Sequence, residues 1–179
     1  MVETGEPMDI AIADDGYFYV QPADGEPALS RRGDLRVTAD GALVNGAGEA
    51  MLDDALQPIV LPPLRSLVID DLGEVMIEPL DGLPGQTVRA AILASVVPNG
   101  IDLRKSPDGL IRAAEGPLPQ PDQRARVVQG MLESSNVNSI EELVQSIDLQ
   151  RTFELNMKMI STAKDLDEAG TKLLRMPDA

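Results

Sequence analysis

Short apolar runs separated by turn signals fill the first 121 residues. Asp-Gly and Asn-Gly pairs recur between the runs, and these residue types tolerate the positive φ angles of tight turns. The runs have the length of strands and cover residues 8–13, 17–21, 35–38, 42–44, 57–61, 66–70, 75–78 and 88–97. This spacing predicts a β-rich domain over residues 1–121, built as an antiparallel sandwich or a partly closed barrel. Residues 98–121 are expected to be rich in loops.

The apolar pattern takes a helical period after residue 121. A short helix is expected over about residues 122–132, followed by a polar interruption. Ser139 with Glu142 then has the form of a capping box. Beyond it, apolar residues recur three or four positions apart, with a change of phase between Ile147 and Phe153. This pattern predicts one helix from Ser139 to Leu174, about 50 Å long, within a C-terminal helical segment over residues 122–179.

The predicted helix has no partner helix in the rest of the sequence. Thirteen of the fourteen prolines lie between Pro7 and Pro121, so the first region is a poor source of helices. Most helix stability comes from packing of an apolar face. We therefore expect another chain, or a segment outside this sequence, to cover the stripe. The fold class expected is mainly β with a long C-terminal α-helix, and an ordinary core helix folded onto its own domain remains the alternative.

Composition narrows the function. The chain has no Cys, His or Trp, which disfavours zinc sites, thiol catalysis and a Ser-His-Asp triad. Its net charge is −15, with −12 in residues 1–120 and −3 in residues 121–179. Nucleic acid and anionic membrane surfaces call for basic footprints, and no apolar stretch is long enough to span a bilayer. We expect no enzyme activity, no cofactor and no metal site.

Three acidic pairs, Asp14-Asp15, Asp53-Asp54 and Asp70-Asp71, allow another reading. They could serve a hydrolase or a calcium-binding β domain, although none fits a calcium loop with its distant Glu. Asp residues in an acidic chain more often belong to turns, which is the favoured interpretation. A secreted, adhesin-like binding domain with a self-associating helix is a further alternative.

Two parts of the sequence resemble the bacterial flagellar rod and hook family. The first comprises residues 4–12, 15–20, 30–35 and 40–44, and the second residues 129–144 and 150–156. Residues 157–163 and 171–176 are most similar to a basal-body rod protein, with the distal rod protein of the same family as the alternative. The motif residues of the β-rich part are Thr4, Gly5, Gly16, Phe18, Arg32, Gly33 and Gly41.

The resemblance implies a structural subunit exported by the flagellar secretion apparatus, a type III export system, into the periplasmic rod of the basal body. Family members self-assemble helically, with N- and C-terminal helices packed as coiled coils inside and the β domain outside. The implied partners are copies of the chain and the proximal and distal rod proteins. The family's N-terminal helix and Asn-rich motif do not precede Thr4, so the chain is expected to be truncated and to fray or pair with itself through its helix.

The resemblance also implies which residues carry assembly. Asn136 and Asn138 would fix the helix entry and hydrogen-bond a neighbouring subunit. Arg151 and Glu154 flank Phe153 in the sequence and are expected to set the register through ion pairs between chains. The apolar residues implied in subunit packing are Ile140, Leu143, Val144, Ile147, Phe153, Met157 and Ile160.

Overall fold

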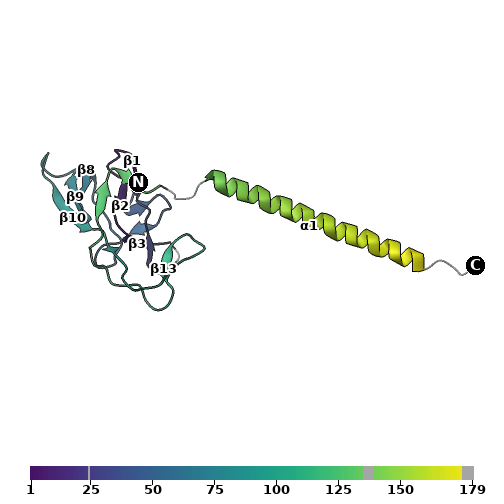
Figure 1. Ribbon diagram of the computed structural model, residues 1–179. Coiled ribbons are helices and arrows are strands. Elements are labelled where there is room, and N and C mark those ends of the chain that lie inside the picture. Colours follow the sequence, from purple (N-terminus) through teal and green to yellow (C-terminus); the bar gives the residue numbers. More distant parts are fainter. Residues whose placement is uncertain (24, 135–138, 175–179) are drawn as a thin grey trace, which may run out of the picture. The chain divides into compact units, whose positions relative to one another are not determined.

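The computed structural model describes residues 1–23, 25–134 and 139–174. The chain divides into two compact units, Met1–Ser134 and Ser135–Ala179. The first unit is built from strands and the second contains one helix (Figure 1). The expected fold class, mainly β with a long C-terminal helix, is confirmed, and the described strands do not close into a barrel.

The largest sheet of the first unit is antiparallel and is centred on β3 (Tyr17–Gln21). Its strand order is β12-β13-β4-β3-β7-β6-β5, and β11 also pairs with β3. The other strands are β4 (Ala28–Ser30), β5 (Leu35–Val37), β6 (Leu43–Asn45), β7 (Ala50–Met51), β11 (Ser95–Val96), β12 (Leu103–Lys105) and β13 (Ile111–Ala113).

Three smaller sheets complete the unit. A three-stranded antiparallel sheet has the order β10-β9-β8 and joins β8 (Leu64–Ile69), β9 (Glu74–Pro79) and β10 (Val88–Ile92). Two antiparallel pairs bring the chain's start beside residues 127–132. These pairs are β2 (Ile10–Ile12) with β14 (Val127–Gln129), and β1 (Val2–Glu3) with β15 (Met131–Leu132).

The core of the first unit lies where these sheets meet. Alternation along the strands places apolar side chains inside, as in β9, where Val75 and Ile77 are buried and their neighbours are more exposed. One cluster includes Ile10, Ile12, Phe18, Leu43, Met51, Val75, Ile77 and Leu93. A second cluster contains Tyr19, Leu29, Leu52, Ala94 and Val96.

The short helix expected over residues 122–132 is wrong, because this segment forms β14 and β15. Gln123 and Gly130 both have positive φ angles, 54° and 77°, which interrupt a helix. Between them, Ala125 and Val127 are buried while Arg126 is exposed, which is the period of a strand. The β unit therefore extends to Ser134, beyond the boundary expected at residue 121.

Other strands differ in detail from the prediction. Residues 57–61 form isolated bridges through Pro58 and Val60 instead of a continuous strand. The loop-rich stretch expected over residues 98–121 also contains the β12–β13 hairpin. The strands β4 and β7 were not predicted, since each is too short to show a period of its own.

The helix α1 spans Ser139–Leu174, 36 residues, as predicted. Glu141 and Glu142 lie in its first turn, where negative charge stabilises the helix dipole. The side chain of Ser139 lies outside the described residues, so the capping box stays a prediction. Among the described residues, no helix combines the length and apolar character required to cross a membrane.

Candidate assembly interface

Two of the motif glycines allow close backbone approach within the β unit. A Cβ atom at Gly33 would lie 1.9 Å from the carbonyl oxygen of Ile10, whose own N–H donates to the Gly33 carbonyl at 2.9 Å. A Cβ atom at Gly16 would lie 2.5 Å from the Cβ atom of Ala125. Any larger residue at either position would push segments of the β unit apart.

Other close backbone contacts in the β unit involve Thr4, Gly5 and Gly41. The N–H groups of Thr4 and Gly5 both donate to the carbonyl of Gly130, at 2.9 and 3.1 Å. Gly41 has a φ of +83°, and its carbonyl accepts from the N–H of Leu61 at 2.8 Å. These residues stabilise the β unit through backbone contacts.

Arg32 and Phe18 are also structural. The guanidinium of Arg32 donates two hydrogen bonds to the Asp34 carboxylate, at 2.7 and 2.8 Å, which lowers the pKa of Asp34. Oδ1 of Asp34, which accepts from Arg32 Nε, also accepts from the N–H of Gly46 at 3.3 Å. Phe18 is fully buried in the larger core cluster.

Arg31, which sequence reasoning did not single out, makes more contacts than its neighbour. Its Nη1 donates to the carbonyls of Asp14 and Gly16, at 2.8 and 2.7 Å, and Nη2 donates to the Ile12 carbonyl at 3.1 Å. Its Nε forms an ion pair with Glu133, and its guanidinium lies 5.6 Å from the ring centre of Tyr17. Arg31 thereby ties the turn after β2 to the end of β15. The sequence of an Arg-Arg pair beside a turn does not show which of the two side chains makes such contacts.

The acidic pairs are turn residues in the structure. Oδ1 of Asp14 accepts from the N–H of Gly16 at 3.0 Å. The first carboxylates of the other pairs, Asp53 and Asp70, likewise each accept two backbone N–H groups two and four positions ahead. Among the described residues, no group of three acidic side chains is arranged to hold a metal ion.

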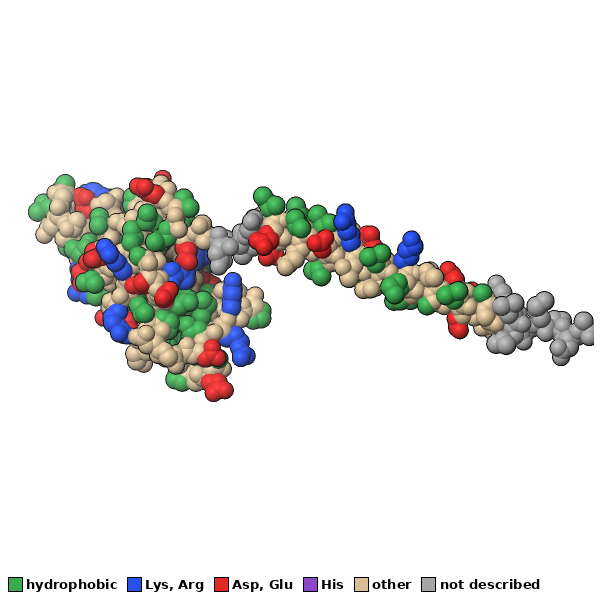
Figure 2. All heavy atoms as spheres, viewed as in Figure 1, with side chains coloured by type: hydrophobic (Ala, Val, Ile, Leu, Met, Phe, Trp, Pro, Cys, Tyr) green, Lys and Arg blue, Asp and Glu red, His purple; other side chains and the backbone are tan. Residues whose placement is uncertain are grey.

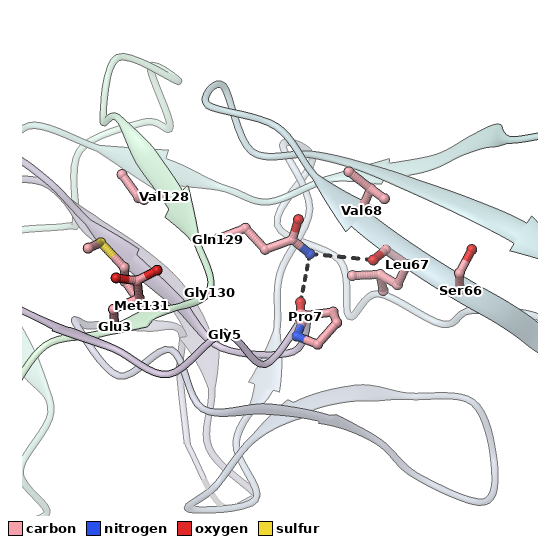
Figure 3. Close-up of a pocket in the computed structure, with 10 residues that line it drawn as sticks. All are labelled: Glu3, Gly5, Pro7, Ser66, Leu67, Val68, Val128, Gln129, Gly130 and Met131. Atoms are coloured by element: carbon pink, nitrogen blue, oxygen red, sulfur yellow. Dashed lines mark hydrogen bonds between the residues drawn. The ribbon is translucent and has the colours of Figure 1, made fainter.

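A groove of about 710 Å³ lies between β8 and β14 (Figure 3). Val68, Val128 and Met131 contribute apolar surface to it. The amide of Gln129 crosses the groove, and its Nε2 donates to the carbonyls of Pro7 and Leu67, at 2.6 and 3.4 Å. Among the described residues that line the groove, Glu3 is the one ionisable side chain, so the groove offers no acid–base pair.

The apolar side chains of α1 form a different kind of surface. Every described side chain from residue 140 to residue 171 is exposed. The large apolar ones range from 45% exposure at Ile147 to 74% at Ile140. Figure 2 shows hydrophobic side chains along the length of the helix in the view drawn.

The helical period arranges these side chains in three seams. With about 3.6 residues per turn, the seams lie roughly a third of a turn apart around the helix. The first seam occupies the N-terminal turns, the middle seam follows it, and the last seam runs toward the C-terminal end. They consist of Ile140, Leu143, Val144 and Ile147; of Leu149, Phe153, Met157 and Ile160; and of Leu155, Met159, Ala163 and Leu166.

The assembly roles expected of the polar residues stay predictions. The helical period places Arg151 and Glu154 on the side of the first seam and not beside Phe153. Within the described residues Arg151 forms no ion pair, and Glu154 accepts a hydrogen bond from Gln150 at 3.4 Å. Asn136 and Asn138 lie outside the described residues.

Comparisons with known proteins match both units. Residues 11–77 match the family model described as "Flagellar hook protein FlgE/F/G D1 domain". Residues 128–173 match "Flagellar basal body rod FlgEFG protein C-terminal".

Individual relatives match almost the whole chain. The flagellar basal-body rod protein FlgF of Escherichia coli K12 is 33% identical over 97% of this chain and 70% of its own length. FlgF of Caulobacter vibrioides is 33% identical over 97% of this chain and 68% of its own length. The rod protein FlgG of Agrobacterium fabrum is 28% identical over 98% of this chain and 68% of its own length.

Proposed function

The chain belongs to the flagellar basal-body rod protein family, and from this premise we propose that it assembles helically into the rod through α1. The predicted resemblance to a rod protein of the FlgF kind, with FlgG as the alternative, is confirmed by relatives of both kinds. The chain is a structural subunit of the flagellar basal body, located in the rod.

The observation that supports assembly through α1 is the distribution of its three seams. The apolar face of a helix is normally packed against another element, whereas the described side chains of α1 are all exposed. One partner helix covers one side of another helix. The middle and last seams overlap in position along α1 but face different directions, so a single partner leaves one of them in water. At least two neighbouring helices are needed.

Helical growth follows from contacts of this kind. When a contact joins two different surfaces of identical subunits and does not close into a ring, it repeats into a filament. The middle and last seams are two such surfaces on one helix. The partners are copies of the chain and other rod subunits, and the helices pack as coiled coils on the inside.

Charge favours an outer position for the β unit. Residues 1–120 carry a net charge of −12, against −3 for residues 121–179. Like-charged surfaces repel when crowded together, so the acidic β units are best accommodated at the larger radius. There they act as spacers and lateral contacts, in a subunit that is exported through the flagellar secretion apparatus and has no catalytic role.

The seams can be tested separately in flagellated cells that make a variant in place of the natural protein. Phe153→Asp alters the middle seam and Met159→Asp the last seam. Ser161→Asp is the matched control, because the helical period places it outside both seams. We expect both seam variants to be lost from purified basal bodies and the control to be retained, as judged by immunoblotting against another rod subunit. Retention of either seam variant at the control level would show that α1 has one partner only.

A further inference from the structure

Two Asn-Gly dipeptides occur in the sequence, Asn45-Gly46 and Asn99-Gly100. In such a pair the Gly backbone nitrogen can attack the side-chain carbonyl carbon of the Asn, since Gly has no side chain to hinder the approach. The reaction requires an Asn side chain that can rotate toward the nitrogen. It also requires a nitrogen whose N–H is not held by an acceptor. The structure places the two pairs in opposite situations.

Asn45 is locked. Its side chain is fully buried, and Nδ2 donates to Glu49 Oε2 at 2.6 Å. Its Oδ1 accepts from the N–H groups of Ala47 and Glu49, at 3.0 and 3.1 Å. The N–H of Gly46 donates to Asp34 Oδ1 at 3.3 Å. Both reacting groups are therefore engaged, and the ring-closing rotation would break this buried network.

Asn99 is free in each of these respects. It lies in the exposed connection between β11 and β12, and within the described residues neither its side chain nor the N–H of Gly100 forms a hydrogen bond. Gly100 has a φ of +70°, and no atom lies within 4 Å of the Cβ position built on it. The nearest backbone hydrogen bonds that fix the connection are at Val97 and Asp102.

We propose that Asn99 is a site of spontaneous deamidation. The Gly100 nitrogen forms a bond to Cγ of Asn99, the Cγ–Nδ2 bond breaks, and the peptide proton leaves with the amide as ammonia. The product is a cyclic imide. Water then opens the ring at either carbonyl, and the chain continues through an aspartyl or an isoaspartyl linkage. Water is the only co-reactant.

The modification adds one negative charge to an already acidic chain, and the isoaspartyl form adds one methylene to the backbone. Because the connection is exposed, it can accommodate both changes without disturbing the core. The isoaspartyl product is the chemical class of substrate on which isoaspartyl methyltransferases act. This inference is independent of the proposed assembly.

The test is an incubation of the folded chain in mildly alkaline buffer, with trypsin digestion and mass spectrometry at intervals. The peptide covering residues 90–104 should gain the mass of an amide-to-acid exchange and become a methyl acceptor for an isoaspartyl methyltransferase. The peptide covering residues 37–65, with Asn45, should stay unchanged. Asn99→Gln, which cannot form the five-membered ring, should abolish the signal and leave the melting temperature unaltered.

A second incubation in denaturant separates the fold from the sequence. Both peptides should then deamidate, because unfolding releases Asn45 and Gly46. An unmodified 90–104 peptide in the folded chain, over a time in which the unfolded chain reacts, would overturn the proposal. Equal rates for the two peptides in the folded chain would overturn it as well.

Discussion

At the scale of single residues, glycine positions in the β unit are set by backbone contacts. Gly33→Ala would place a methyl group on the carbonyl oxygen of Ile10, 1.9 Å from the built Cβ atom. Overpacking against backbone cannot be relieved by a rotamer change, so we expect the free energy of unfolding to fall by on the order of 3 kcal/mol. Gly82→Ala is the control, since its nearest atom is 3.4 Å away. Urea denaturation measures both, and equal midpoints would contradict the close approach.

A second prediction at the scale of residues concerns Tyr19 and the stability of the fold at high pH. Burial, with a smaller contribution from the charge of Asp122, raises the pKa of Tyr19 from 10.0 to about 12. The unfolded chain therefore releases this proton first, and stability is lost as pH rises from the lower value to the higher. The loss should reach about 2 kcal/mol.

Urea denaturation across that pH range measures the effect, and Tyr19→Phe is the matched variant. It removes the titrating hydroxyl and the hydrogen bond to the Pro119 carbonyl while keeping the ring. The variant should be less stable at neutral pH and lack this alkaline dependence. An unchanged alkaline slope would assign the effect to another group.

At the scale of elements, the sequence pattern predicted the elements whose form depends on neighbouring residues, and missed those whose form depends on distant pairing. The helix Ser139–Leu174 is long and each part of it has a helical period of apolar residues, and its bounds were predicted correctly. The segment over residues 122–132 was predicted wrongly, because its form depends on β2, more than a hundred positions earlier, which pairs Val127 with Ile12. The strands β4 and β7 are also formed by pairing with β3. The three seams follow from the helical period, whereas the contacts of Arg31 require the fold.

The prediction at the scale of elements concerns the contacts of Arg31 between the turn after β2 and β15. Arg31→Gln removes the ion pair with Glu133 and leaves the carbonyls of Asp14 and Gly16 without their donor. We expect a loss of about 2 kcal/mol in the free energy of unfolding, with faster hydrogen exchange in β1 and β15. Arg104→Gln is the control, an exposed strand arginine with no ion pair among the described residues. Unchanged hydrogen exchange in β15 would contradict the role of Arg31 in holding β15 to the turn after β2.

At the scale of the whole molecule, the two units differ in how they are stabilised. The β unit has a buried core of its own, whereas α1 has no buried side chain among the described positions 140–171. In proteins, most helix stability comes from tertiary packing of an apolar face, which α1 lacks within the described residues. The stability of α1 must then depend on neighbours and so on protein concentration, while that of the β unit should not.

Ending the chain after Ser134 tests this difference. The melting temperature of the β unit should stay the same, because its core lies entirely within Met1–Ser134. The helical circular dichroism signal and any self-association seen by analytical ultracentrifugation should both disappear. In the full chain, the helical signal should rise with protein concentration, and salt should promote association by screening the repulsion between chains of net charge −15. A helical signal independent of concentration would mean that α1 is stable alone, which would remove the main support for assembly through its seams.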